Sequence, residues 1–106
     1  MSMWSIEYIP EARNDLLSLD KTQRIQVLKA IEKVSANPLP TTEGGLGKPL
    51  GSQSGGNLTG YLKIKLLKLG LRVVYKVVHE KDVMRIIVIS VRDDETVYKI
   101  ARARIK

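Results

Sequence analysis

The sequence contains no cysteine and only one histidine, His79. Without cysteine, the chain can form no disulfide scaffold, no cysteine nucleophile and no cysteine-ligated metal site. A single histidine also excludes a histidine-rich metal site or a histidine-based catalytic triad within one chain. We therefore expect no metal and no other cofactor, and the lack of cysteine is compatible with a reducing cytoplasm.

Phenylalanine is absent as well, and no apolar run is long. Leucine, isoleucine, valine and the four tyrosines must then fill the core. The longest apolar run near the predicted sheet is broken by Arg85, and it falls far short of the roughly 20 residues that cross a membrane. The N-terminus shows no charged-then-apolar signal. For 106 residues we expect one domain, residues 1–106, without membrane association.

Positive charge is in excess, and all of the excess lies in one part of the chain. The formal net charge is +7. Residues 1–60 carry six basic and six acidic side chains, whereas residues 61–106 carry twelve basic and five acidic ones. Such an asymmetry predicts a polyanionic partner, with nucleic acid as the first candidate. The alternative is a basic face that only binds solvent.

The first forty residues predict a short strand and a helical hairpin. Residues 4–8 alternate large and polar side chains, which is typical of a half-buried strand. Pro10 suits the first turn of the helix that follows. Asp20 and Gln23 have the spacing of a capping box, and Asn37-Pro38 would end the second helix. We interpret both helices as scaffold that covers one face of a sheet.

Residues 41–60 predict a long loop rather than a linker between domains. They contain seven of the eight glycines, and neither side of them could fold alone. Apolar residues within the loop should hold it against the body, namely Leu46, Pro49, Leu50 and Leu58.

Two strand patterns separated by Gly70 carry the basic side chains. The period of two places Lys63 and Lys65 on one face of the first strand, and Arg72 and Lys76 on one face of the second. A hairpin loop of even length around Gly70 would place Lys65 directly across from Arg72. A loop of odd length with a bulge would separate them. The placement of the apolar residues favours the even length.

A third strand pattern, residues 83–91, is almost wholly apolar and predicts a central strand buried on both faces. Asp93-Asp94-Glu95 then begins a C-terminal helix. Strict alternation would place five residues of this region on one side, namely Met84, Ile86, Val88, Ser90 and Arg92. The predicted order is strand, helix, helix, three antiparallel strands, helix. It indicates an α+β fold in which a helical hairpin packs on a small antiparallel sheet and leaves the basic face open.

Lysine, arginine and tyrosine can together cleave RNA without a metal. The 2′-hydroxyl beside the scissile phosphate is an internal nucleophile, and the planar fork of arginine binds two phosphate oxygens. Cationic neighbours favour the neutral, basic form of a lysine, so Lys65 between Lys63 and Arg72 could serve as the base. Most exposed lysines and arginines, however, catalyse nothing, and these residues alone leave catalysis open.

Several segments resemble the RelE/ParE family of toxins from bacterial type II toxin–antitoxin systems. They are Gly47-Lys-Pro-Leu50, Leu58-Thr-Gly-Tyr-Leu-Lys-Ile-Lys-Leu66, Leu71-Arg-Val-Val-Tyr-Lys-Val77, Val88-Ile-Ser-Val91 and Val97-Tyr98. The resemblance covers essentially the whole chain. It implies a RelE-like fold, similar to that of small microbial ribonucleases, and metal-independent cleavage of mRNA in the ribosomal A site. It also implies an antitoxin that wraps and neutralises the toxin.

The family pattern also implies roles for single residues. Lys63 and Lys65 would hold the RNA backbone, with Lys65 as the base. Arg72 would stabilise the transition state or assist the leaving group, and Tyr98 would stack on the substrate or orient it. We expect Lys76 to add to RNA binding. The implied partners are mRNA on the ribosome and a cognate acidic antitoxin that covers the basic face.

One segment departs from the family pattern. RelE-like toxins usually carry a basic run after the third strand, whereas here Arg92 is followed by Asp93-Asp94-Glu95, which a phosphate would avoid. We assign Arg92 to the catalytic set. ParE-like members poison DNA gyrase and cut no RNA, and the paired lysines with Arg72 favour the RelE side. A non-catalytic basic module that binds RNA or an acidic partner is a third hypothesis.

Overall fold

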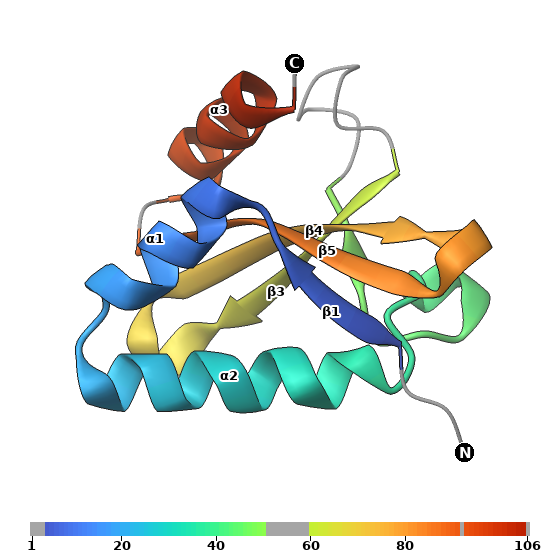
Figure 1. Ribbon diagram of the computed structural model, residues 1–106, viewed down its shortest axis with the longest axis horizontal. Coiled ribbons are helices and arrows are strands. Elements are labelled where there is room, and N and C mark those ends of the chain that lie inside the picture. Colours follow the sequence, from blue (N-terminus) through green and yellow to red (C-terminus); the bar gives the residue numbers. More distant parts are fainter. Residues whose placement is uncertain (1–3, 51–59, 92, 106) are drawn as a thin grey trace.

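The computed structural model describes residues 4–50, 60–91 and 93–105 (Figure 1). Five strands form one sheet in the order β1-β5-β4-β3-β2. They are β1 (Ser5–Tyr8), β2 (Lys48–Pro49), β3 (Tyr61–Leu66), β4 (Leu71–Val78) and β5 (Val83–Ser90). The helices are α1 (Pro10–Ser18), α2 (Lys21–Ser35) and α3 (Asp94–Arg104). The α+β class and the helical hairpin are therefore confirmed.

The sheet is mixed rather than wholly antiparallel. β1 runs parallel to β5 at the edge, while the remaining neighbours pair antiparallel. The local sequence pattern predicts the strand β1 itself. It does not predict the pairing partner of β1, because paired residues such as Glu7 and Arg85 are 78 positions apart in the chain. At the edge, β1 is largely exposed, so the half-buried strand expected from its alternation is only partly realised.

The helical hairpin forms as its end signals predict. Pro10 occupies the first turn of α1. Asp20 accepts a 2.8 Å hydrogen bond from the backbone N–H of Gln23, and the Gln23 side chain accepts one from the Asp20 N–H. This capping box satisfies two N–H groups that an isolated helix end would leave without partners. Ala12 of α1 is fully buried, as are Val27 and Ile31 of α2.

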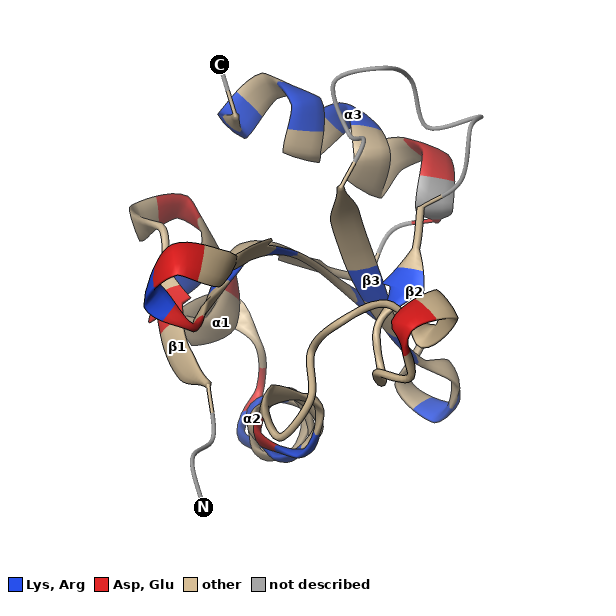
Figure 2. Ribbon diagram, turned by 90° about the vertical axis from the view of Figure 1, so that its right-hand side faces the viewer, with Lys and Arg blue, Asp and Glu red and all other residues tan. Residues whose placement is uncertain are grey.

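Helices cover both faces of the sheet, which corrects the expectation of an open basic face. One core cluster joins α1 and α2 to one face, and a second cluster joins α3 to the other through Val74, Val88, Val97 and Ala101. Figure 2 shows α2 and α3 on opposite sides of the sheet. The basic face is therefore a partly covered surface beside α3. None of the helices in the described part of the chain is long and apolar enough to span a membrane.

A bulge in β5 corrects the predicted alternation of that strand. Val74 of β4 pairs with Val88, but the next residue, Tyr75, pairs with Ile86, so Ile87 is the extra residue. The bulge reverses the faces of the first half of the strand. Ile86 therefore packs in the cluster beneath α1 and α2, whereas Val88 packs under α3. β5 is buried along most of its length, so its predicted central position is confirmed.

The loop of residues 41–60 contains a short turn of 3-10 helix and the edge strand β2. Leu50 is buried and belongs to the cluster under α3, as expected. Leu46 is 47% exposed and Pro49 is also exposed, so neither side chain packs into the core. Backbone pairing of β2 with β3 attaches this segment to the sheet instead. Leu58 lies outside the described residues.

Candidate functional site

Lys65 and Arg72 lie directly opposite each other on β3 and β4. The strands are joined by four residues, a turn of 3-10 helix at Leu67–Leu69 and Gly70, so the loop has even length. Gly70 has φ 64°, a left-handed conformation that glycine adopts without strain. Directly paired side chains project from the same face, so the predicted register is confirmed.

The next pair of functional side chains joins β3 to α3. Lys63 donates a 2.9 Å hydrogen bond from Nζ to the hydroxyl oxygen of Tyr98, and its ammonium lies 5.6 Å from the centroid of the Tyr98 ring. The two residues are 35 positions apart in sequence, and both are partly buried. Because Lys63 and Lys65 share one face of β3, Tyr98 is held beside the same surface as Lys65 and Arg72. The sequence analysis assigns these four residues to the candidate site. The structure places them on one face.

Lys48 is a member of this surface that the sequence pattern misses. It lies on β2, where it pairs directly with Lys63. Lys48 lies within residues 41–60, the glycine-rich stretch that predicts a loop, so no strand period indicates the direction of its side chain. The sequence Gly47-Lys-Pro-Leu50 is nevertheless part of the resemblance to RelE-like toxins, and that is the signal that could have identified Lys48.

Lys76 is placed on the same face as Arg72 but at the opposite end of β4. It pairs directly with Tyr61 on one side and with Arg85 on the other. Its ammonium lies 5.6 Å from the centroid of the Tyr61 ring. Three residues of an extended strand separate Lys76 from Arg72, so this predicted RNA-binding lysine does not contact the Lys65–Arg72 pair. Burial raises the pKa of the Tyr61 hydroxyl, and the charge of Arg85 partly opposes that rise.

Arg92 lies outside the described residues, so its assignment stays a prediction. The first of the acids that follow it has a structural role. Asp93 is the N-cap of α3, and its carboxylate accepts a 2.8 Å hydrogen bond from the backbone N–H of Thr96. A carboxylate is favourable at a helix N-terminus. Where RelE-like toxins usually carry a basic run, this chain therefore has an acidic N-cap, Asp93, which begins the helix that carries Tyr98.

The fold is shared with RelE toxins. A variant of E. coli RelE with two arginines replaced by alanine, in the free state, has 25% identity and a TM-score of 0.75 over 99% of this chain and 100% of that chain. The isolated E. coli RelE toxin has 27% identity and a TM-score of 0.68 over 97% and 99%. This chain is RelE-like.

A chain of similar fold also occurs in a toxin–antitoxin complex. The intact E. coli RelBE toxin–antitoxin complex contains a chain with 26% identity and a TM-score of 0.65, with 85% of this chain and 98% of that chain covered. No protein-family model matches the sequence, and no curated protein matches it. The similarity thus lies in the three-dimensional arrangement more than in the sequence.

The basic face of this chain has the residues to bind a polyanion and position a phosphate. Lys48 and Lys63 form one cross-strand row, and Lys65 and Arg72 form the next. Ser90 of β5 pairs with Arg72 and extends this second row with a hydroxyl. Several cations on one face raise the local positive potential, which attracts a phosphate.

Proposed function

We propose that this chain is the toxin of a toxin–antitoxin pair. In this proposal it acts in the cytoplasm and cuts mRNA on the ribosome as a metal-independent endoribonuclease. The observation that carries the proposal is the arrangement of Lys63, Lys65, Arg72 and Tyr98 on one face of a RelE-like fold.

The proposed reaction is a transesterification within the RNA. The 2′-oxygen attacks the adjacent phosphorus, the bond to the 5′-oxygen breaks, and the products end in a 2′,3′-cyclic phosphate and a 5′-hydroxyl. Lys65 takes the proton from the 2′-hydroxyl, and a proton reaches the departing 5′-oxygen. Arg72 binds the non-bridging oxygens, on which negative charge grows in the transition state.

Lys63 and Tyr98 position the substrate in this proposal. The 2.9 Å hydrogen bond fixes the Tyr98 hydroxyl and leaves its ring beside the sheet. An aromatic ring there can stack on a base, a contact worth about 1–3 kcal/mol per base in single-stranded complexes. Lys48 and Lys63 contribute charge to the RNA backbone. Arg92 is proposed as a further cation at the phosphate.

The proposed partner is an acidic antitoxin. The E. coli structure named as an intact RelBE toxin–antitoxin complex supports this part of the proposal, because it contains a toxin chain of the same fold. The excess of positive charge from residue 61 onward gives an acidic protein a surface to cover. A covered basic face could not reach mRNA.

Primer extension on mRNA from cells expressing the protein tests the nuclease activity. The wild-type chain should produce new cuts within translated regions, and the same cuts should arise in a purified translation reaction. Lys65→Ala and Arg72→Ala should each lower the cutting rate by about 10²-fold or more, in line with the loss of one transition-state contact. Lys29→Ala, which removes an exposed charge from α2, serves as the matched control and should cut normally.

Two outcomes would contradict the proposal. Intact message together with blocked DNA replication would indicate gyrase poisoning, as in ParE-like toxins. Growth arrest that persists in Arg72→Ala, without any cutting by the wild type, would indicate a basic module that binds without catalysis.

A further inference from the structure

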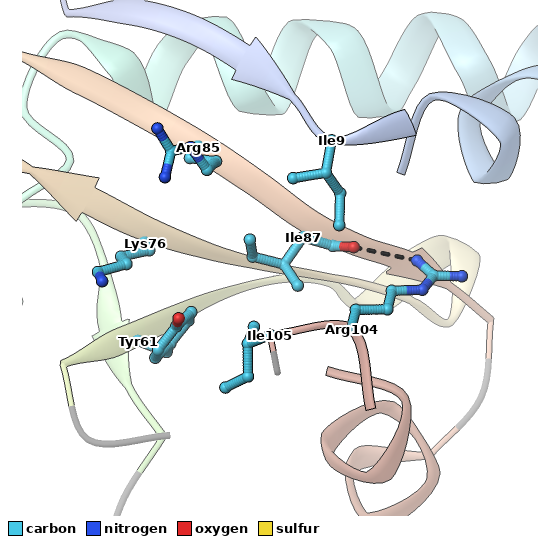
Figure 3. A pocket seen from close by; sticks show the side chains of 7 residues that line it. All are labelled: Ile9, Tyr61, Lys76, Arg85, Ile87, Arg104 and Ile105. Atoms are coloured by element: carbon cyan, nitrogen blue, oxygen red, sulfur yellow. Dashed lines mark hydrogen bonds between the residues drawn. The ribbon is translucent and has the colours of Figure 1, made fainter. Parts of the chain in front are cut away.

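A hollow of about 270 Å³ lies on the basic face (Figure 3). Neither Lys65 nor Arg72 lines it. Its apolar part is lined by three isoleucines, Ile9, Ile87 and Ile105. They come from the segment after β1, from β5 and from the end of α3, so only the folded chain assembles them.

The bulge in β5 orients two of the residues that line this hollow. Ile87 is the extra residue of the bulge, and it turns toward the α3 side of the sheet. The same bulge places Arg85 in the row of Lys76, so that Arg85 also lines the hollow. With strict alternation, Arg85 and Val88 would project from opposite faces.

Arg104 closes one end of the hollow without offering its charge to a ligand. Its guanidinium donates hydrogen bonds to the Ile87 carbonyl oxygen at 3.0 Å and to both oxygens of the Asp15 carboxylate at 2.6 and 3.1 Å. Figure 3 shows the bond to Ile87. The charge at this end is therefore compensated.

The opposite end carries positive charge. Lys76 and Arg85 lie in one cross-strand row with Tyr61. Arg85 Nε lies 2.6 Å from a carboxylate oxygen of Glu7, but both side chains of this pair are substantially exposed, so solvent weakens it. Among the described residues, one carboxylate thus compensates two cations at this end. An anion would be attracted to Lys76 and Arg85.

This end continues the rows of basic side chains that begin at the Lys65–Arg72 pair, where the proposed function places the RNA. The basic side chains of the face form successive rows two residues apart along β3 and β4. The rows start with Lys65 and Arg72, continue with Lys48 and Lys63, and end with Lys76 and Arg85. A polymer with one negative charge in each repeat can follow such equally spaced rows.

We propose that the hollow is a nucleotide subsite. The phosphate binds to Lys76 and Arg85, and the sugar and base lie against Ile9, Ile87 and Ile105. The nucleotide would belong to the RNA strand whose scissile phosphate lies at Lys65 and Arg72, two rows away. That last assignment rests on the proposed function, whereas binding of a nucleotide in the hollow can be measured independently of cutting.

Titration of the ¹⁵N-labelled full chain with adenosine 5′-monophosphate tests the subsite by NMR. The amide signals of Tyr61, Lys76, Arg85 and Ile105 should shift together. Lys76→Ala should weaken binding at least fivefold, and Lys29→Ala should leave it unchanged. Lys76 is exposed, so its truncation should not unfold the chain, and the spectrum itself reports whether the fold is intact.

Three ligands separate the possible outcomes. Inorganic phosphate and adenosine should each bind more weakly than the monophosphate, because each lacks half of the proposed contacts. Equal binding of inorganic phosphate would overturn the proposal, since the isoleucines would then contribute nothing. Shifts caused only by an acidic, leucine-containing peptide would overturn it in favour of a protein partner.

The cutting assay distinguishes this proposal from the nuclease proposal. Lys76→Ala should lower the cutting rate several-fold, far less than Arg72→Ala does. Cuts by the wild type without nucleotide shifts in the hollow would reject the subsite and keep the nuclease. Nucleotide shifts without any cuts would keep the binding site and reject the nuclease.

Discussion

Tyr75 is the largest fully buried side chain, and its surroundings dictate the residue at position 47. The Tyr75 hydroxyl donates a 2.7 Å hydrogen bond to the Pro38 carbonyl oxygen. A Cβ atom built on Gly47 would lie 2.0 Å from that hydroxyl oxygen. Glycine is therefore the residue that lets the chain pass Tyr75 and bring Lys48 alongside Lys63.

Gly47→Ala should destabilise the protein by about 1–3 kcal/mol, the usual cost of forcing an extra methyl group into a packed site. Urea unfolding followed by circular dichroism measures this change. Gly44→Ala is the contrasting variant. At φ +83° an alanine strains the backbone, but its methyl group meets no neighbouring atom, so this variant lacks the clash expected at Gly47. If Gly47→Ala unfolded at the same urea concentration as the wild type, the result would contradict the packing around Tyr75.

Tyr75 also predicts a pH dependence. Burial raises the pKa of its hydroxyl above the ordinary value of 10.0, so the native state keeps a proton that the unfolded state loses. The free energy of unfolding should therefore be unaffected by Tyr75 below about pH 10 and should fall as the pH rises above 10. Tyr75→Phe should show a shallower fall in urea midpoint between pH 9 and 11. An equally steep fall in the variant would contradict this prediction.

At the scale of elements, an ion pair joins α3 to the body. Arg104 of α3 and Asp15 of α1 are each about four-fifths buried, with a shortest N–O distance of 2.6 Å. Asp15 also accepts a 3.0 Å hydrogen bond from the Ile89 N–H. The pair thus joins two helices on opposite faces to the central strand β5. Because Tyr98 is on α3, this contact also supports the position of the Tyr98 ring.

Asp15→Ala should lower the free energy of unfolding by about 3 kcal/mol, since it leaves a buried guanidinium without its carboxylate. Arg104→Ala should have a similar effect, and the double variant should lose less than the sum of the two. Urea unfolding of the three variants measures the coupling. Glu95→Ala is the control, because its pair with Lys99 on α3 is exposed and should not affect stability measurably. Additive losses would show that the pair contributes no coupling.

At the scale of the whole molecule, the uneven distribution of charge determines how the basic face should respond to salt. Single-stranded RNA releases counterions when lysines and arginines replace them, so binding weakens as salt increases. Lys63 lies in the middle row of the face, between Lys48 and Val74. Lys29 carries the same charge on α2, across the sheet from α3.

Lys63→Ala should reduce the slope of log K against log salt by about 0.7, the value for one phosphate contact with a single strand. Fluorescence anisotropy with an uncleavable 2′-deoxy oligonucleotide at several salt concentrations provides the measurement. Lys29→Ala should leave the slope unchanged. Equal slopes for wild type and Lys63→Ala would place the RNA elsewhere on the molecule.

The sequence by itself determined the features that depend on neighbouring residues. The end signals at Pro10 and Asp20 depend on contacts within a few residues, and so does the hairpin that places Lys65 across from Arg72. Their physical causes are helix capping and the two-residue period of a strand, which short segments already contain. Tyr98 was found through a family resemblance, since no local pattern links it to Lys63.

The tertiary structure alone decided the features that depend on distant pairing. The parallel edge strand β1, the bulge at Ile87 and the seat of α3 on the basic face each arise from contacts between segments far apart in the chain. Packing selects them by burying apolar surface on both faces of β5, and a one-residue bulge then reverses the direction of every side chain beyond it. For this reason Lys48 and Arg85 joined the basic face only in the folded molecule.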